Sequence, residues 1–168
     1  MIKTIIFDFG GVIFDNGTKK VINLLKDKYG ISPQVSRDIY CSEDSWDLRA
    51  GKITSKDFWK SIYNKYQNNE VLSSLDLRKL WYDNYTLRKN MLDLLNNLKD
   101  KHQLGVISGN IEDRVNYLKK KYNLQKMFDF ELYSYDYSLH KNNSELYSEA
   151  KKKLSCLPSE CLFIDDNQ

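Results

Sequence analysis

The sequence predicts an α/β fold in which a parallel sheet is interrupted once by an all-helical insertion. Short apolar runs of strand length stand at residues 2–7, 104–107, 130–133 and 162–164. In the second half of the chain these runs alternate with segments of helical periodicity, which favours parallel strands joined by right-handed crossovers. From about residue 16 to residue 85 no convincing strand occurs, so we expect helices there.

The first apolar run, Ile2–Phe7, has the length and composition of a buried strand and ends at Asp8, Gly10 and Gly11. A helix should follow, because Val21, Leu25 and Tyr29 share one face. Gly30 is a typical C-terminal stop for that helix.

The rest of the insertion carries helix start signals. Ser32-Pro33 resembles an N-cap followed by proline at the first helical position. Thr54 or Ser55 is expected to cap a further segment, and its apolar positions are Phe58, Trp59, Ile62 and Tyr66. The last helical segment has apolar residues at Leu72, Leu75, Leu77, Leu80 and Trp81.

After the insertion, three helical stripes separate the remaining strands. The first comprises Leu87, Met91, Leu94, Leu95 and Leu98. The second comprises Ile111, Val115, Leu118 and Tyr122, with Asn110 as its expected N-cap. The third comprises Leu146, Tyr147, Ala150 and Leu154.

Composition narrows the classes of protein. The 168 residues suit one domain with an insertion, and 41% hydrophobic residues can form a core. Mean hydropathy is −0.62, and no apolar run approaches the roughly 20 residues of a membrane span. With no signal-peptide pattern at the N-terminus, we expect a cytoplasmic protein without a membrane partner.

The charge and the cysteines exclude other classes. The net charge is +3, and its basic runs, 119–121 and 151–153, lie in helix-like segments where solvated faces are usual. No recognition motif accompanies them, so no nucleic-acid partner is expected. Three cysteines without a CxxC pair predict neither a disulfide framework nor a zinc site.

Polar residues follow three of the predicted strands: Asp8, Ser108, and the pair Asp165-Asp166. Ligands of open parallel sheets bind outside the carboxyl ends of strands, so these residues should converge, with Lys141 in a loop at the same edge. One alternative is that each acid only caps the segment after it. Clustered carboxylates repel one another and need a cation, and oxygen ligands suit Mg²⁺.

Four segments carry a family resemblance. In order, "IIFDFGGV", "LGVISGN", "HKNNSELY" and "CLFIDDN" resemble the four motifs of the haloacid dehalogenase-like (HAD) superfamily. The match is to subfamily I, with a helical C1 cap after an Asp-x-Gly-Gly-Val first motif. It implies a three-layer, Rossmann-like core from residues 1–15 and 86–168, and a cap from residues 16–85.

The resemblance also implies roles for individual residues. Asp8 would be the nucleophile that forms an aspartyl-phosphate, Ser108 would bind a phosphoryl oxygen, and Lys141 would hold Asp8 and the phosphoryl group together. The substrate-binding residues would further include Gly11, Gly109 and Asn110. The Mg²⁺ ligands would be Asp8, Asp166, the Gly10 carbonyl and, through water, Asp165.

The most important departure from the family pattern is Gly10. Family phosphatases usually have a second Asp there, which protonates the leaving oxygen, and such acid–base help is worth about 10²–10⁴-fold in rate. Some subgroups have Gly at this position and still include phosphatases. Asp15 is either a substitute acid or a polar turn residue before Asn16-Gly17.

Other departures are local. Asn142 stands where proline is usual, and Gly109 precedes Asn110 where Ser-Asn is usual. The sequence ends directly after the fourth motif, where relatives continue through another helix and strand. We therefore expect the last strand of the core to be missing and one sheet edge to be uncovered.

The insertion carries large aromatic residues that either line a pocket or form its core: Trp46, Phe58, Trp59 and Trp81. Aromatic residues at helical spacing usually pack in a core. His102 is expected to be incidental. His140, beside Lys141, either contacts the substrate or lies on a surface loop, and the loop is favoured.

Three functions fit the pattern. The first is an Mg²⁺-dependent phosphomonoester hydrolase acting on a small phosphorylated metabolite, as a monomer or homodimer. The second is a catalytically weakened relative that binds a phosphorylated ligand or a protein partner. The third is carbon–halogen hydrolysis, against which the Asp165-Asp166 pair argues, because that reaction needs no metal.

Overall fold

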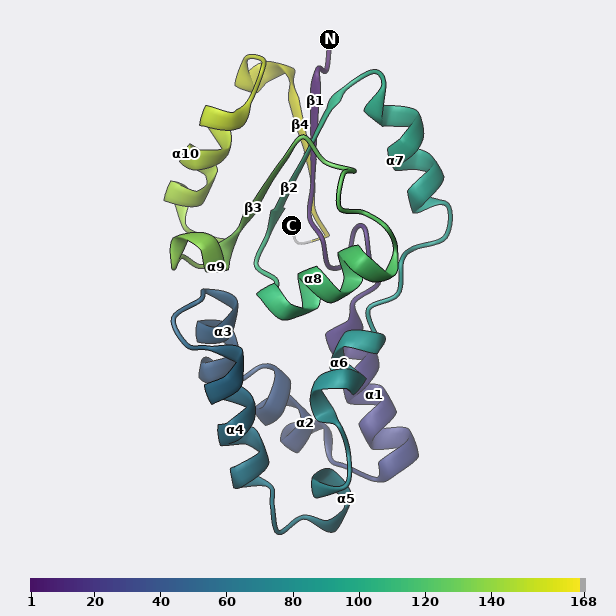
Figure 1. Ribbon diagram of the computed structural model, residues 1–168, viewed down its shortest axis with the longest axis vertical. Coiled ribbons are helices and arrows are strands. Elements are labelled where there is room, and N and C mark those ends of the chain that lie inside the picture. The colour runs from purple at the N-terminus through teal and green to yellow at the C-terminus, as the bar shows by residue number, and fades with distance from the viewer. Residues whose placement is uncertain (167–168) are drawn as a thin grey trace.

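The computed structural model describes residues 1–166 and confirms the predicted parallel sheet (Figure 1). Within these residues the strands are β1 (Thr4–Phe7), β2 (Gln103–Ser108), β3 (Phe130–Tyr133) and β4 (Cys161–Ile164). Their order across the sheet is β3-β2-β1-β4, and every pair is parallel. β1 begins at Thr4 rather than at Ile2, whose side chain is exposed. β4 forms one edge of the sheet.

Helices cover both faces of the sheet, as the alternating apolar residues of the strands require. On one face Ile6 and Ile107 pack with Leu146 of α10 (Ser144–Lys153). On the other face Ile5 and Val106 belong to the core that includes residues of α7 (Met91–Lys99) and α8 (Glu112–Lys121). The molecule is therefore a three-layer α/β fold around the sheet.

The insertion between β1 and α7 is helical and is called the helical unit below (residues 17–83). Its helices are α1 (Gly17–Tyr29), α2 (Pro33–Tyr40), α3 (Glu43–Arg49), α4 (Ser55–Lys65), α5 (Glu70–Ser73) and α6 (Leu77–Asp83). Two short elements of the sheet unit were not expected from the sequence: α9 (Ser134–Tyr137) and the 3₁₀ turn Pro158–Glu160. In the part of the chain that the structure describes, no helix has the length and apolar character to cross a bilayer.

The predicted helix signals operate as expected in the helical unit. Ser32 accepts a hydrogen bond from the Val35 N–H, and Thr54 accepts one from the Asp57 N–H. Gly30 ends α1 in the left-handed conformation, with φ of 67°. These contacts satisfy backbone groups that a helix end leaves without partners.

The expected cap at Asn110 is wrong. α8 begins at Glu112, its N-cap position is Ile111, and the described side chains give it no cap hydrogen bond. The Asn110 Oδ1 atom instead accepts hydrogen bonds from the Ile111 N–H at 3.0 Å and from Nε of Arg114 at 2.6 Å. The amide oxygen is thus shared by the N-cap residue and by an arginine one turn into the helix.

Aromatic packing forms the centre of the helical unit. Trp81 is fully buried, with its ring 5.0 Å from that of Tyr40 and 6.0 Å from that of Trp59, measured between centroids. Phe58 is buried beside Trp59. Three of the four large aromatic residues therefore belong to the core, whereas Trp46 is 51% exposed.

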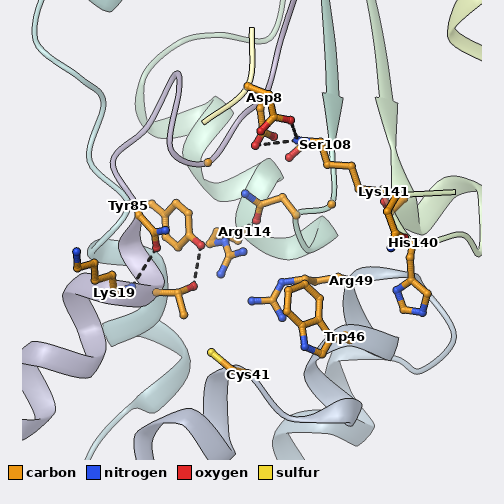
Figure 2. Close-up of a pocket in the computed structure, with 18 of the residues that line it drawn as sticks. Asp8, Lys19, Cys41, Trp46, Arg49, Tyr85, Ser108, Arg114, His140 and Lys141 are labelled. Atoms are coloured by element: carbon orange, nitrogen blue, oxygen red, sulfur yellow. Dashed lines mark hydrogen bonds and ion pairs between the residues drawn. The ribbon is translucent and has the colours of Figure 1, made fainter. Parts of the chain in front are cut away.

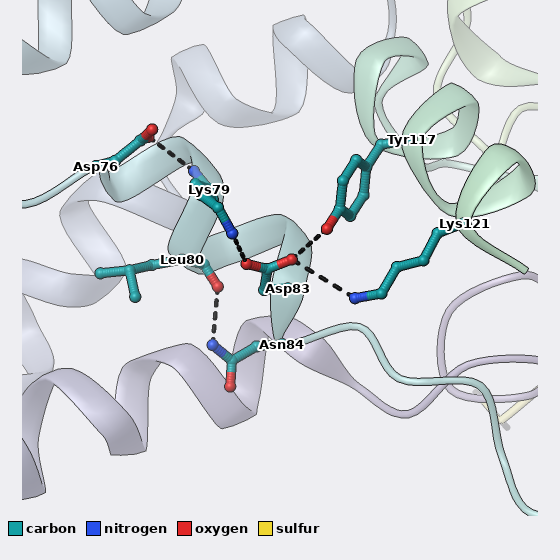
Figure 3. Close-up of polar contacts among 7 residues, drawn as sticks. All are labelled: Asp76, Lys79, Leu80, Asp83, Asn84, Tyr117 and Lys121. Atoms are coloured by element: carbon teal, nitrogen blue, oxygen red, sulfur yellow. Dashed lines mark hydrogen bonds and ion pairs between the residues drawn. The ribbon is translucent and has the colours of Figure 1, made fainter.

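The helical unit contacts the sheet unit at two places. Gly51, after α3, has φ of 70°, and a Cβ atom there would stand 2.5 Å from the carbonyl oxygen of Tyr135 in α9. At the other place, Asp83 of α6 accepts a hydrogen bond from Tyr117 of α8 and pairs with Lys121 at 3.6 Å (Figure 3). These contacts hold the helical unit below α9 and α8 in the view of Figure 1.

The Asp83 contact is a charged one. Partial burial disfavours the carboxylate, but hydrogen bonds from Lys79 and Tyr117 outweigh it and lower the pKa of Asp83. The carboxylate is therefore ionised at neutral pH, which strengthens its contacts with α8.

Candidate active site

Strand register brings the predicted polar residues to one edge of the sheet. Phe7 pairs with Val106 of β2 and with Ile164 of β4. The residues that follow these strands therefore lie side by side at the carboxyl edge. The Asp8 N–H donates to the Ile164 carbonyl at 2.9 Å, and both Asp8 and Ser108 are buried there.

Lys141 joins two of the carboxylates. Its Nζ atom lies 2.8 Å from Oδ2 of Asp8 and 2.7 Å from Oδ2 of Asp165. The lysine comes from the loop between α9 and α10, and Figure 2 shows it reaching Asp8 beside Ser108. One ammonium group thus bridges the ends of β1 and β4.

The three aspartates form a group that fits a divalent metal ion. Asp8, Asp165 and Asp166 each offer one carboxylate oxygen, and these oxygens lie within 4.8 Å of one another. Lys141 supplies one positive charge against three negative ones, so the remaining repulsion favours a further cation. An all-oxygen donor set with room for water is what Mg²⁺ prefers.

The glycine pair after Asp8 has two different roles. Gly11 has φ of 92°, and a Cβ atom there would stand 2.1 Å from Oδ2 of Asp166. Only glycine lets the chain turn and leaves room for that carboxylate. Gly10 lines the cavity beside Asp8, and a Cβ atom on it would lie 3.2 Å from the Tyr85 ring.

The surroundings of the Asp8 carboxyl disfavour its ionised form. Burial raises its pKa above the ordinary value, and the opposing effects of Lys141, the Phe9 N–H and Ser108 do not cancel this. The Phe9 N–H donates to Oδ1 of Asp8 at 2.6 Å. In the protein without metal, the ionised form of Asp8 is thus disfavoured relative to the unfolded chain.

A cavity of about 1420 Å³ opens in front of these residues. Its lining combines the strand ends with α1, α2 and α3 of the helical unit, so the cavity lies between the two units. The predicted residues Gly109 and Asn110 are part of this lining, and a Cβ atom on Gly109 would lie 3.2 Å from Cβ of Lys141. The volume exceeds that of an inorganic phosphate severalfold.

The structure decides between alternatives for two single residues. His140 lies in the expected loop, but it also lines the cavity, and its Nε2 atom lies 3.5 Å from Nζ of Lys52. Asp15 does not line the cavity. It accepts hydrogen bonds from Lys20 and Thr86, which hold its pKa low, and this favours the turn interpretation.

Sequence reasoning missed four cationic residues of the cavity: Lys19, Arg37, Arg49 and Arg114. Arg114 carried a signal, because it falls on the apolar stripe formed by Ile111, Val115 and Leu118. A charged residue at a core position of a helix needs a reason. Arg49 carried none, since a basic residue in the last turn of a helix is common.

Comparison with known proteins agrees with this geometry. A family model described as haloacid dehalogenase-like hydrolase matches residues 2–168. An uncharacterized protein of Dictyostelium discoideum is 33% identical over 141 residues. That match covers 80% of this chain and 59% of the relative, so the chain spans little more than half the length of that curated protein.

Solved structures share the fold. A HAD family enzyme of Bacteroides thetaiotaomicron, in complex with magnesium and inorganic phosphate, has a TM-score of 0.76 at 22% identity. The alignment covers 100% of this chain and 86% of that one. The L-2-haloacid dehalogenase of Xanthobacter autotrophicus has a TM-score of 0.64 at 20% identity, with 97% and 69% covered.

We expect Gly11→Ala to weaken the metal site. The new Cβ atom would displace Asp166, in addition to the strain of about 1–2 kcal/mol that a left-handed alanine carries. The Mg²⁺-induced increase in Tm, measured by calorimetry, should therefore shrink. Gly30→Ala is the matched control, because its φ is also positive and no atom lies within 4 Å of the added Cβ. An equal loss of the Mg²⁺ effect in both variants would contradict the role of Gly11.

We expect Asp8→Asn to stabilise the metal-free protein at neutral pH. Burial raises the pKa of Asp8 in the folded state, so as pH rises the carboxyl ionises in the unfolded state before it does in the folded state. Ionisation therefore favours the unfolded state, and the free energy of unfolding of the wild type falls. The asparagine side chain does not ionise, so the variant is not destabilised in this way. Urea denaturation in EDTA, between about pH 4 and pH 7, should show the difference growing with pH. A wild type that is more stable than the variant at pH 7 would mean that the pairing with Lys141 outweighs burial.

Proposed function

The chain belongs to the haloacid dehalogenase-like hydrolase family, and we propose that it is an Mg²⁺-dependent phosphomonoester hydrolase acting on a small phosphorylated metabolite. One observation carries the proposal: Lys141 bridges Asp8 and Asp165 beside a group of three carboxylates that fits Mg²⁺. The magnesium and phosphate in the Bacteroides enzyme, which has the same fold, support the same chemistry here. Within the family we assign the chain to the subgroup with a helical cap, residues 16–85, and a core of residues 1–15 and 86–168.

The proposed reaction starts at Asp8. Its carboxylate attacks phosphorus, the ester oxygen leaves with its electron pair, and an aspartyl-phosphate forms. Water then attacks this phosphorus, which releases phosphate and restores the Asp8 carboxylate. Phe9 N–H holds Oδ1 of Asp8, and Lys141 holds Oδ2, so the nucleophile is fixed before the substrate arrives.

Neighbouring groups stabilise the charge of the phosphoryl group. Lys141 offsets negative charge that would otherwise repel the dianion from Asp8. Ser108 and the loop of Gly109 and Asn110 donate hydrogen bonds to phosphoryl oxygens, and the turn at Gly11 contributes beside them. When bound by Asp8, Asp165, Asp166 and the Gly10 carbonyl, Mg²⁺ would supply further charge neutralisation.

The proposed enzyme lacks the usual acid for the leaving group. Gly10 offers no carboxylate, and Asp15 is engaged with Lys20 and Thr86 away from the cavity. Esters whose leaving oxygen needs little protonation should therefore react best. This absence also favours the second candidate function, a weakened relative that binds a phosphorylated ligand through Ser108 and Lys141.

Carbon–halogen hydrolysis is less consistent with the site. The dehalogenase of Xanthobacter shares the fold at 20% identity, and its structure contains covalently bound chloropropionic acid. Here the carboxylates of Asp8, Asp165 and Asp166 gather as metal ligands would. Their joint charge suits a cation and a phosphate better than a neutral carbon–halogen bond.

The nucleophile is tested with an activated aryl phosphate. We expect Mg²⁺-dependent release that EDTA stops and that Asp8→Asn reduces on the order of 10⁴-fold or more, as loss of a nucleophile does. Asp15→Asn is the matched control and should keep the activity, because Asp15 lies outside the cavity. Release that survives in the Asp8 variant would exclude the aspartyl-phosphate mechanism. Folded wild type without any release would favour the binding protein.

Restoring the missing acid should increase turnover of poor substrates. The Cβ atom of Gly10→Asp would lie 3.6 Å from Nδ2 of Asn110 and 3.2 Å from the Tyr85 ring. The ring must therefore shift slightly. We expect kcat for an alkyl phosphate to rise by up to about 10²-fold, and that for an aryl phosphate to change little. Steady-state kinetics on the two esters measure this. An unchanged ratio between them would show that another group already protonates the leaving oxygen.

A further inference from the structure

The charge of the cavity changes sign away from the strand ends. Its lining acids among the described residues, Asp8 and Asp165, both lie at the sheet edge beside Lys141. Among residues 1–166, the remainder of the lining contains no carboxylate and has four lysine or arginine residues: Lys19, Arg37, Arg49 and Arg114. A phosphoryl group bound at Asp8 leaves this second group of charges without a partner.

Arg114 is the most unusual of these residues. It is 1% exposed, and Nε donates to Asn110, but Nη1 is buried without a hydrogen-bond partner in residues 1–166. No carboxylate within the described chain forms an ion pair with it. Burial and the nearby Arg49 lower the pKa of Arg114 to about 10, so it remains charged at neutral pH. An unpaired buried charge is costly unless a ligand pairs with it.

Aromatic rings fix the orientation of the Arg114 guanidinium. Its central carbon lies 4.2 Å from the ring centroid of Trp81 and 4.0 Å from that of Tyr85. Ring faces attract the cation and hold its plane, but they do not satisfy N–H groups in that plane. The stacking therefore accounts for the position of Arg114 and not for its free donor.

Arg49 approaches from the other unit. It is 7% exposed, donates to the backbone carbonyls of Ser45 and Tyr40, and lies 5.1 Å from the ring centroid of Trp81. Figure 2 shows both guanidinium groups turned into the cavity, between Cys41 and the group of Asp8, Ser108 and Lys141. Two like charges that share one indole and have no acidic partner fit an anion between them.

We infer that Arg49 and Arg114 form a second anion subsite, so that the substrate is a phosphomonoester that carries a second anionic group, a carboxylate or a further phosphate. This inference rests on the proposed function, since it places the reacting phosphoryl group at Asp8. The planar forks of the arginines suit the oxygens of either anion. Arg49 of the helical unit and Arg114 of α8 thus select together for charge at the far end of the substrate.

Matched substrates test the subsite. Alkyl phosphates from ethyl to hexyl would be compared with esters of the same length whose far end carries a carboxylate or a phosphate. For the wild type we expect kcat/KM to be roughly 10- to 100-fold higher for one charged series, as hydrogen bonds to charged groups provide. The series with the higher kcat/KM identifies the anion that the subsite binds. The chain length with the highest kcat/KM gives the distance of the subsite from Asp8.

Variants assign this preference to the two arginines. Arg114→Met and Arg49→Met should each bring the ratio of charged-end to methyl-end esters close to one. Arg114→Lys and Arg49→Lys keep a positive charge in the cavity and should therefore keep part of the ratio. They replace a methionine variant that circular dichroism shows to be unfolded. Arg78→Met, an exposed arginine that does not line the cavity, is the control and should leave the ratio unchanged.

Binding separates this inference from the proposed function. The same esters would be titrated by calorimetry into Asp8→Asn protein with Mg²⁺. If wild type hydrolyses none of them but charged ends bind more tightly, and the arginine variants lose this, the subsite stands and the hydrolase proposal fails. Hydrolysis could instead occur with a ratio of kcat/KM near one between charged-end and methyl-end esters, or with a ratio that the arginine variants do not change. Either result overturns the subsite and leaves the hydrolase proposal standing.

Discussion

β1 lies between two parallel neighbours, and this position brings like charges together. Phe7 pairs with residues of β2 and β4 at the same height, so Asp8 must end its strand beside Ser108 and Asp165. Three carboxylates within 4.8 Å cannot remain there without compensation. Lys141 provides one positive charge, and Gly11 provides the space that Asp166 occupies. The loop before α10 and the turn after β1 are therefore both constrained by the same group of charges.

The cavity in front of this group has two chemically different halves. The sheet edge offers carboxylates and Lys141, which suit a metal ion and a phosphoryl group, whereas the helical unit and α8 offer arginines. Trp81 holds the arginines of the second half together, because both Arg49 and Arg114 stack on it. Its burial in the core of the helical unit ties the position of those charges to the packing of α2 and α4. The proposed selection at the far end of the substrate therefore requires the helical unit to be docked at Gly51 and Asp83.

The site is better equipped to bind anions than to transfer protons. Buried cations, Ser108 and the loop at Gly109 are all present, but Gly10 offers no acid, and Asp15 is held elsewhere by Lys20 and Thr86. Such a site stabilises a charged phosphoryl group through fixed dipoles and charges, which is a large part of catalysis by itself. The proposed activity and the alternative of ligand binding use the same contacts. They differ in whether the site hydrolyses its ligand without an acid at position 10.

The sequence by itself determined the parallel strands, the helical insertion and the polar residues after three of the strands, since these depend on apolar periodicity and on chain order. It also determined the helix ends at Ser32 and Gly30 and limited a third to Thr54 or Ser55, because such contacts span only a few residues. Only the tertiary structure decided that Asn110 holds Arg114 rather than capping α8, that His140 faces the cavity, and that Arg49 meets Arg114 across Trp81. Those contacts join elements from distant parts of the chain, and no local periodicity specifies which side chains will face one another when two packed units meet.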